Sequence, residues 1–273
     1  LTLSVCKALS YFSDDPELPV KYRLLPPVLA AIAGFSALTG AARAQSASAD
    51  AVFSTKQRAA IVQIIRQALQ DDPTILTESI RSLCAKAQQQ QEDKSMAGVR
   101  AHRDELQQAP DFAVRGNPHG KITVVEFFDP RCSYCRHMMP VVDAFLARHP
   151  DVRLVEKLVP VLGEGSVIDT RAIFAASAQG KYDVMRRALM DDTTKPTMDR
   201  VSEVAKANGL DMTRFAADMS APQTVALITT NLDQARAVNL DGTPTFIFGT
   251  AAMAPGALEP DQMDEFLERA RKA

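Results

Sequence analysis

The feature that most constrains the fold of this chain is the segment KITVVEFFDPRCSYCRHMMP at residues 121–140. An apolar run of strand length ends at Asp129, and Cys132 and Cys135 follow at the start of a segment with helical character. A sulfur at the first turn of a helix lies near unpaired backbone N–H groups and the positive end of the helix dipole, which favour the thiolate over the thiol. Because the thiolate is the form that attacks disulfides, this strand-to-helix unit predicts thiol–disulfide exchange chemistry.

Length and charge set the bounds for the rest of the chain. Its 273 residues are 46% hydrophobic, which is enough for one large domain or two modest ones with a real core. The formal net charge at pH 7 is -2, so electrostatics give no argument for binding nucleic acid.

Residues 1–44 are expected to be an upstream extension followed by a secretory signal peptide. Two basic residues precede an apolar stretch at residues 24–38, and the sequence Ala-Arg-Ala that ends at Ala44 is typical of a cleavage site. A retained N-terminal anchor is the alternative. Cleavage after Ala44 would release the chain into the periplasm, an oxidising compartment in which disulfide chemistry has partners.

Residues 45–108 predict an N-terminal helical segment. Ser54 and Gln57 have the pattern of a capping box, and apolar residues then recur at helical spacing as far as Cys84. The chain that follows is polar and rich in strong helix formers, which predicts a long and mostly exposed helix. Because the first two helices are too small to bury their own apolar stripes, the segment is either an oligomerisation stalk or a solvated linker. Cys84 is interpreted either as a buried small hydrophobe or as the site of an intermolecular disulfide.

Residues 109–273 predict an α/β domain of the thioredoxin-like type with an inserted helical subdomain at about 165–236. Strands are expected near residues 111–115, 121–128, 152–159 and 245–248, and helices near 132–148 and 260–272. The order of strand, helix, strand, helical block, strand and helix leads to this fold class.

The two cysteines are expected to divide the exchange reaction between them. Cys132 is the predicted nucleophile, and Cys135, one helical turn further in, is the predicted resolving thiol that releases the mixed disulfide. Ser133 and Tyr134 tune the redox poise, and neither is charged. The couple is therefore expected to be less oxidising than one with His between the cysteines. His137, just after the pair, is interpreted as a residue of the helix surface.

Glu126 is a carboxyl group inside the apolar strand that ends at the cysteine pair. Burial without a partner is costly and raises the pKa of a carboxyl group. We expect Glu126 to accept the proton of Cys135 during exchange. The alternative is an edge position that is open to water.

The turn GTPTF at residues 242–246 is the third candidate feature. A proline directly before a short strand suits a cis peptide bond between Thr243 and Pro244. Such a bond would aim the Thr243 backbone at the cysteines, where an extended substrate could pair with it.

Metal and cofactor sites also use paired cysteines. A zinc site needs four ligands, and no second Cys/His pair has suitable spacing. Attached haem needs His directly after the second cysteine, where this chain has Arg136. We expect no metal and no cofactor at this site.

Roughly residues 110–273 resemble the DsbA-like branch of the thioredoxin superfamily. The resemblance is carried by the segments EFFDPRCSYC and GTPTF and by the helical block between them. The resemblance implies that Cys132 and Cys135 are the redox pair, that Glu126 is a buried acid, and that Pro244 is a cis-proline.

Two details refine this resemblance. Residues 53–108 are similar to the N-terminal segment of ScsC-type proteins, some of which oligomerise through it and act as disulfide isomerases. Thr243 before the proline resembles the isomerase and ScsC-type pattern, whereas Ser133-Tyr134 departs from the Pro-His of DsbA.

The sequence thus predicts a periplasmic thiol–disulfide oxidoreductase that acts on unfolded or misfolded exported proteins, with a leaning to isomerase or reductase. A redox partner of the envelope would reset it. The alternatives are a DsbA-type dithiol oxidase and a non-catalytic copper-binding tolerance protein, since soft thiolates suit Cu(I).

Overall fold

A computed structural model describes residues 53–273, which fall into two compact units. Residues 53–89 are the described part of the first unit, and residues 90–273 form the second. The predicted signal peptide lies outside the described residues. Within residues 53–273, no helix has the length and apolar character that a membrane crossing requires.

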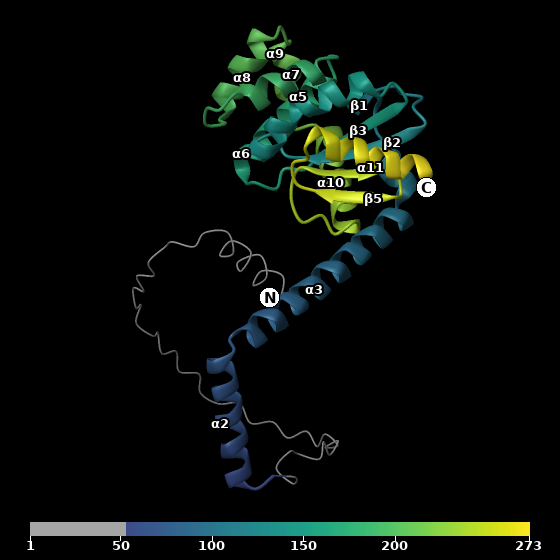
Figure 1. Ribbon diagram of the computed structural model, residues 1–273. Coiled ribbons are helices and arrows are strands. Elements are labelled where there is room, and N and C mark those ends of the chain that lie inside the picture. Colours follow the sequence, from purple (N-terminus) through teal and green to yellow (C-terminus); the bar gives the residue numbers. More distant parts are fainter. Residues whose placement is uncertain (1–52) are drawn as a thin grey trace, which may run out of the picture. The chain divides into compact units, whose positions relative to one another are not determined.

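The described part of the first unit contains α2 (Thr55–Asp71) and the N-terminal part of α3 (Thr74–Ala101) (Figure 1). The predicted capping box at Ser54 is confirmed, with the Ser54 and Gln57 side chains each bonded to the other's backbone N–H. α2 buries none of its residues, and Ile64 is 67% exposed. The expectation that this helix pair leaves its apolar stripe uncovered is therefore confirmed. Cys84 lies in α3 and is partly exposed rather than buried.

The prediction of an exposed helix as far as residue 108 is wrong at its C-terminal end. Val99 in α3 is 0% exposed and Leu106 in α4 (Arg103–Gln107) is 2% exposed, and both belong to a core cluster of the second unit. Gly98 permits this packing, because a Cβ there would lie 2.2 Å from the Ala237 carbonyl oxygen. A few apolar side chains among many polar ones, including the partly buried Met96, are enough to anchor the end of the helical segment in this core.

A five-stranded sheet with the order β1-β3-β2-β4-β5 organises the second unit. β2 and β3 run parallel, and every other neighbouring pair is antiparallel. The strands are β1 (Val114–Gly116), β2 (Ile122–Phe128), β3 (Val152–Leu158), β4 (Thr245–Phe248) and β5 (Ala252–Pro255). β2 is central and apolar on both faces, which explains its near-continuous hydrophobic run.

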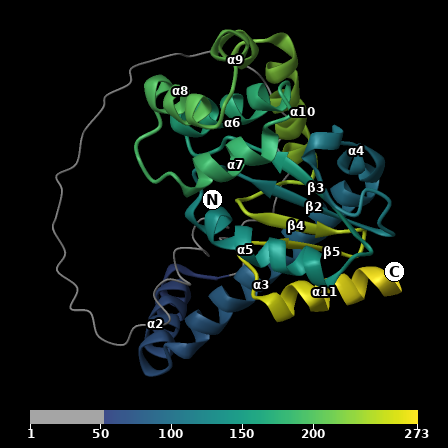
Figure 2. The ribbon, with the colours of Figure 1, turned by 90° about the horizontal axis from the view of Figure 1, so that it is seen from above.

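Helices cover both faces of this sheet (Figure 2). α5 (Ser133–Arg148) and α11 (Pro260–Lys272) contribute to a core cluster with one set of strand residues that includes Val124 and Phe246. The other face, with Val125 and Phe127, packs against residues of α3, α4 and α10 (Pro222–Ala237). This arrangement confirms the predicted α/β class of thioredoxin type.

The predicted helical block is inserted between β3 and β4. It comprises α6 (Glu164–Ser177), α7 (Tyr182–Asp191), α8 (Met198–Ala207), α9 (Met212–Met219) and α10. Its core cluster also contains Cys132 and Cys135, so the insertion packs directly against the cysteine pair.

Two strand assignments differ from expectation. Residues 111–113 form a short 3-10 helix, η2 (Asp111–Ala113), and the first strand starts only at Val114. Residues 252–255, for which the sequence predicted no strand, pair with β4 as an edge strand. Their proline ends the strand at the sheet edge, where no ladder donor is needed.

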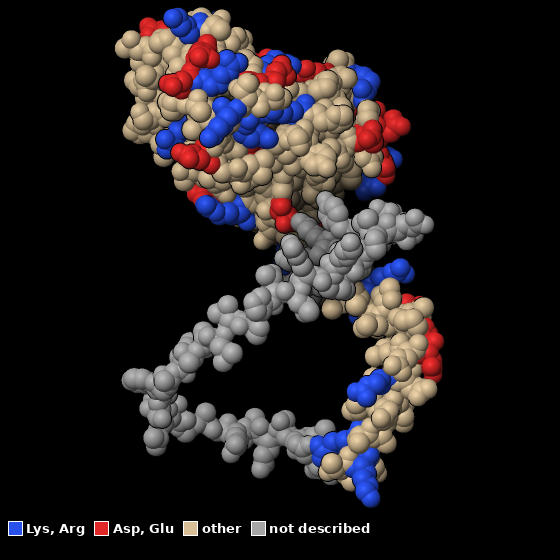
Figure 3. Space-filling model, turned by 90° about the vertical axis from the view of Figure 1, so that its left-hand side faces the viewer, with Lys and Arg blue, Asp and Glu red and all other residues tan. Residues whose placement is uncertain are grey.

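The surface of the second unit carries mixed charge. Figure 3 shows basic and acidic side chains interspersed on one face. Many form ion pairs within one helix, such as Arg269 with Glu265 at 2.5 Å. Exposed pairs of this kind contribute little to stability.

Candidate active site

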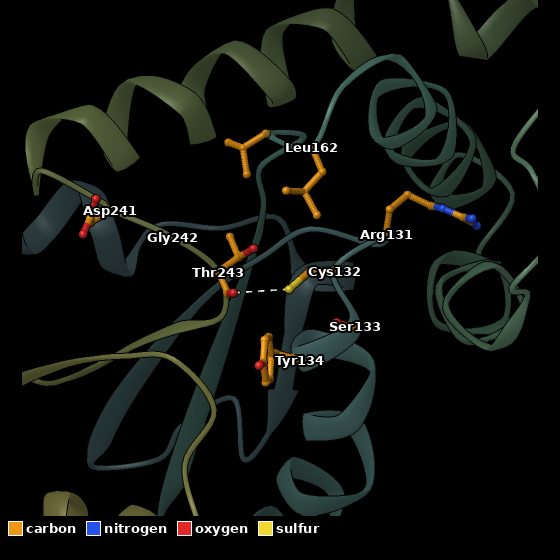
Figure 4. Close-up of a pocket in the computed structure, with 9 residues that line it drawn as sticks. Arg131, Cys132, Ser133, Tyr134, Leu162, Asp241, Gly242 and Thr243 are labelled. Carbon is orange, nitrogen blue, oxygen red and sulfur yellow. Dashed lines mark hydrogen bonds between the residues drawn. The ribbon is translucent and has the colours of Figure 1, made fainter. Parts of the chain in front are cut away.

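Cys132 is the N-cap residue of α5, directly after the loop that follows β2. It is 6% exposed, and it lines a pocket of about 590 Å³ (Figure 4). As a thiol, Cys132 donates a hydrogen bond from Sγ to the Thr243 carbonyl oxygen at 3.2 Å. Hydrogen bonds from the Cys135 thiol, and from the backbone N–H groups of Tyr134 and Cys135, lower the pKa of Cys132 to about 5. Cys132 is therefore a thiolate at neutral pH.

Cys135 lies one turn further along α5 and is 1% exposed. Burial, reinforced by the Cys132 thiolate and by Glu126, raises the pKa of Cys135 far above its ordinary value. Both cysteines are free thiols in this structure. The N-terminus of α5 thus carries an ionised sulfur at Cys132 and a protonated sulfur at Cys135. Two-step exchange needs this difference, because one sulfur must attack the substrate first and the other must react only later.

Glu126 lies in β2 and is 6% exposed, so it is not at an edge open to water. Burial raises its pKa to about 8, and the neighbouring Glu156 adds to the effect. A carboxyl group with this pKa, close enough to Cys135 to influence the pKa of that thiol, is suited to exchange a proton with it.

Glu156 is a functional candidate that the sequence analysis did not identify. It is the register partner of Glu126 on β3, and its carboxylate is bound by three groups from other elements. Arg115 Nη1 lies 3.1 Å from one oxygen, and the Tyr182 hydroxyl donates to the other at 3.0 Å. Arg186 Nε lies 3.5 Å from that second oxygen. Its only sequence signal was a second acid inside an apolar strand.

The peptide bond between Thr243 and Pro244 is cis, as the turn pattern predicts. It precedes β4 and places the Thr243 carbonyl beside the Cys132 sulfur (Figure 4). Thr243 lines the same pocket as Cys132, Ser133 and Tyr134. Tyr134 is 65% exposed. The structure therefore brings together every residue that the sequence singled out for this site, with Glu126 and Cys135 behind the pocket.

The sequence did not indicate two further residues that line the pocket, nor a buried residue that is hydrogen-bonded to both of them. Val161 and Leu162 line the pocket from the segment between β3 and α6. Asp129 lies behind them and is 0% exposed. The Asp-Pro pair before the cysteines was interpreted only as the end of a strand, although a buried aspartate needs partners.

The described residues contain no cluster of three or more His, Cys, Asp or Glu side chains arranged to hold a metal ion. His137 is exposed on α5 and takes no part in the pocket.

Comparisons with known proteins agree with this geometry. Residues 123–268 match the family described as the DSBA-like thioredoxin domain. A thioredoxin-like oxidoreductase from Silicibacter pomeroyi is 42% identical, with a TM-score of 0.59 over 63% of this chain and 98% of that one. A linker-deletion mutant of ScsC from Proteus mirabilis is 21% identical and shares the fold, with a TM-score of 0.57 over 82% of this chain and 100% of that one.

A match of another kind is a Na(+)/H(+) antiporter NhaA from Herminiimonas arsenicoxydans. It is 28% identical over 160 residues, which are 58% of this chain and 25% of the antiporter. The chain thus spans about a quarter of the length of that relative.

Proposed function

Since the chain belongs to the family of DSBA-like thioredoxin domains, we propose that it exchanges disulfides in unfolded or misfolded exported proteins through Cys132 and Cys135. The observation that carries this proposal is the pair of opposed pKa shifts. The pKa of Cys132 is lowered to about 5, and that of Cys135 is raised by burial.

The chemistry proceeds in two displacements. The Cys132 thiolate attacks one sulfur of a substrate disulfide, forms a mixed disulfide with it, and releases the other substrate sulfur as a thiolate. Cys135 then loses its proton and attacks the Cys132 sulfur. The Cys132–Cys135 disulfide forms, the second substrate sulfur leaves as a thiolate, and the substrate has gained two electrons.

Glu126 takes the proton that Cys135 must lose in the second displacement. A buried thiol cannot pass its proton to bulk water directly, and Glu126 is the carboxyl group whose charge acts on Cys135. Its pKa of about 8 makes it a stronger base than an ordinary carboxylate.

Isomerase or reductase action is our preferred mode, with the periplasm as the location and an envelope redox partner as the source of electrons. An isomerase gains from holding its substrate between copies of itself. The uncovered apolar residues of α2, with Ile64 67% exposed and Ile65 53% exposed, support association through residues 45–108.

Dithiol oxidase action is the second candidate, and one observation favours it. A low pKa of the nucleophile stabilises the reduced form and makes the disulfide more oxidising. The value of about 5 for Cys132 lies between the roughly 7 of thioredoxin and the roughly 3.5 of DsbA.

Reactivation of scrambled ribonuclease tests the preferred mode. The double variant Ile61→Lys with Ile65→Lys places charge on the apolar face of α2 and changes no residue of the second unit. We expect these changes to dissociate the oligomer and to lower isomerase activity, while reduction of a small disulfide is retained. Unchanged isomerase activity in a dissociated protein would contradict the role of association. Absence of thiol–disulfide exchange in the wild type would contradict the function itself.

A further inference from the structure

The Asp129 carboxylate ties the loop before the cysteines to the segment that follows β3. It is 0% exposed and accepts three backbone hydrogen bonds. Arg131 N donates to Oδ1 at 2.7 Å. Val161 N and Leu162 N donate to Oδ2 at 2.8 and 3.0 Å. Because one buried side chain accepts backbone hydrogen bonds from both segments, it fixes two parts of the chain that are far apart in the sequence.

The segment held in this way displays two apolar side chains beside the nucleophile. Val161 is 49% exposed and Leu162 is 58% exposed, although nearly every other large apolar residue near the cysteines is buried. Both line the pocket that contains Cys132 and Thr243, and Figure 4 shows Leu162 on one side of the Cys132 sulfur. Apolar side chains held in water next to a reactive group mark a contact surface.

Two charged residues, Arg131 and Asp241, also line this pocket, and Arg131 points away from the apolar surface. Figure 4 shows the Arg131 side chain directed away from Leu162 and Thr243. Its guanidinium donates to the Asp192 and Thr194 carbonyl oxygens at 3.0 and 2.8 Å. The part of the pocket between Cys132 and Leu162 is thereby left to apolar contacts.

We propose that Val161 and Leu162 form a subsite for a large apolar side chain adjacent to the substrate cysteine, and that Asp129 is the positioning residue that holds this subsite beside Cys132. The occupant is an extended polypeptide, because the pocket contains the sulfur that attacks its disulfide and the Thr243 backbone directly before β4, beside which an extended chain could lie. The inference rests on the proposed function and specifies the substrates that it favours.

Two peptide probes test this subsite. Each contains one cysteine linked to thionitrobenzoate as a mixed disulfide, with either Leu or Ser next to that cysteine. Reduced full-length protein attacks the peptide sulfur and releases coloured thionitrobenzoate. For the wild type, we expect kcat/KM to be about tenfold higher for the Leu peptide than for the Ser peptide. Partial burial of one leucine side chain gives a ratio of this size, and the difference should appear in KM.

Three variants assign the preference to its residues. Val161→Ser with Leu162→Ser changes only exposed side chains and should bring the ratio close to one. Asp129→Asn leaves a single oxygen for two loops and should lower the ratio to below about threefold through KM, which a loss of folded protein would not do. Val225→Ser, an equally exposed valine on α10 outside the pocket (43%), should keep the full preference.

The outcomes separate the two proposals. If neither peptide released thionitrobenzoate, the proposed function would fail. If the wild type treated both peptides alike, or if the double serine variant kept the preference, exchange would stand and the subsite would be refuted. Full preference in Asp129→Asn would refute the positioning role of Asp129.

Discussion

The two described units of this chain treat their side chains in opposite ways. In residues 90–273, charged groups such as Glu156 are buried and bound by partners from several elements. In residues 53–89, apolar groups such as Ile64 are exposed, and α2 has no core of its own. The first pattern belongs to a site whose chemistry needs low dielectric and fixed partners. The second is typical of a surface that contacts another molecule.

Replacement of one cysteine in each unit is expected to give the largest difference between the units, and the difference is in the rate of disulfide reduction. Cys132→Ser removes the nucleophile and should abolish reduction of peptide and small-molecule disulfides. Cys84→Ser, in the first unit, should leave the rate of reduction unchanged within about twofold. The measurement is thionitrobenzoate release from a mixed disulfide. Residual exchange in Cys132→Ser would mean that another thiol starts the reaction.

Truncation of apolar side chains should separate the units by stability. Phe246 is 0% exposed, and Phe246→Ala should lower the free energy of unfolding by about 3–5 kcal/mol. Ile64→Ala should change it by less than about 0.5 kcal/mol in dilute protein, because the side chain is 67% exposed. Denaturant titrations at two protein concentrations check this. A cost for Ile64→Ala that grows with concentration would show the α2 face covered by another copy.

Glu126→Gln tests the role of the buried acid, and its expected effect is smaller than those of Cys132→Ser and Phe246→Ala. The Glu126 pKa of about 8 means that the carboxylate becomes the main form only above this pH. Release of peptide from the Cys132 mixed disulfide should therefore accelerate as pH rises through about 8 in the wild type. In Glu126→Gln this rise should disappear, and release at high pH should be about a hundredfold slower. A persistent rise would assign the proton transfer to another group.

The raised pKa of Glu126 also makes the stability of the fold depend on pH, and stability should fall as pH rises. The folded protein holds a proton on Glu126 between pH 4.5 and about 8, where the unfolded chain has lost it. The free energy of unfolding should therefore decline as pH rises across this window. Denaturant titrations at several pH values should show a smaller decline in Glu126→Gln. An equal decline in both proteins would contradict the raised pKa.

Local patterns were enough to predict the secondary structure around the candidate active site. The residues of β2, the cysteine pair and α5 are contiguous. One short segment of sequence therefore indicates both the length of the strand and the start of the helix. β4 and α11 were also predicted with their observed bounds, Thr245–Phe248 and Pro260–Lys272. A proline lies directly before β4 and at the first position of α11, so the start of each element is marked in the sequence.

Features that depend on register were not predictable in this way. Glu156 faces Glu126 only because β2 and β3 pair in parallel at that register. Asp129 reaches Val161 and Leu162 across more than thirty residues of sequence. Such partners are set by tertiary packing, and a single sequence gives no signal for which buried acid meets which backbone donor.

Tyr134→His should produce the smallest effect and shows how local the redox poise is. An imidazolium between the cysteines would stabilise the Cys132 thiolate and move the pKa of Cys132 below its present value of about 5. Tyr134 is 65% exposed, so water screens the new charge, and we expect only a threefold to roughly tenfold shift of the equilibrium with glutathione toward the dithiol. Alkylation of Cys132 as a function of pH measures the first change, and redox titration measures the second. Ile65→His, which places the same side chain on α2, should change neither quantity. An equal shift in both variants would mean that the first unit influences the poise of the second, and the division of roles between the two regions would no longer hold.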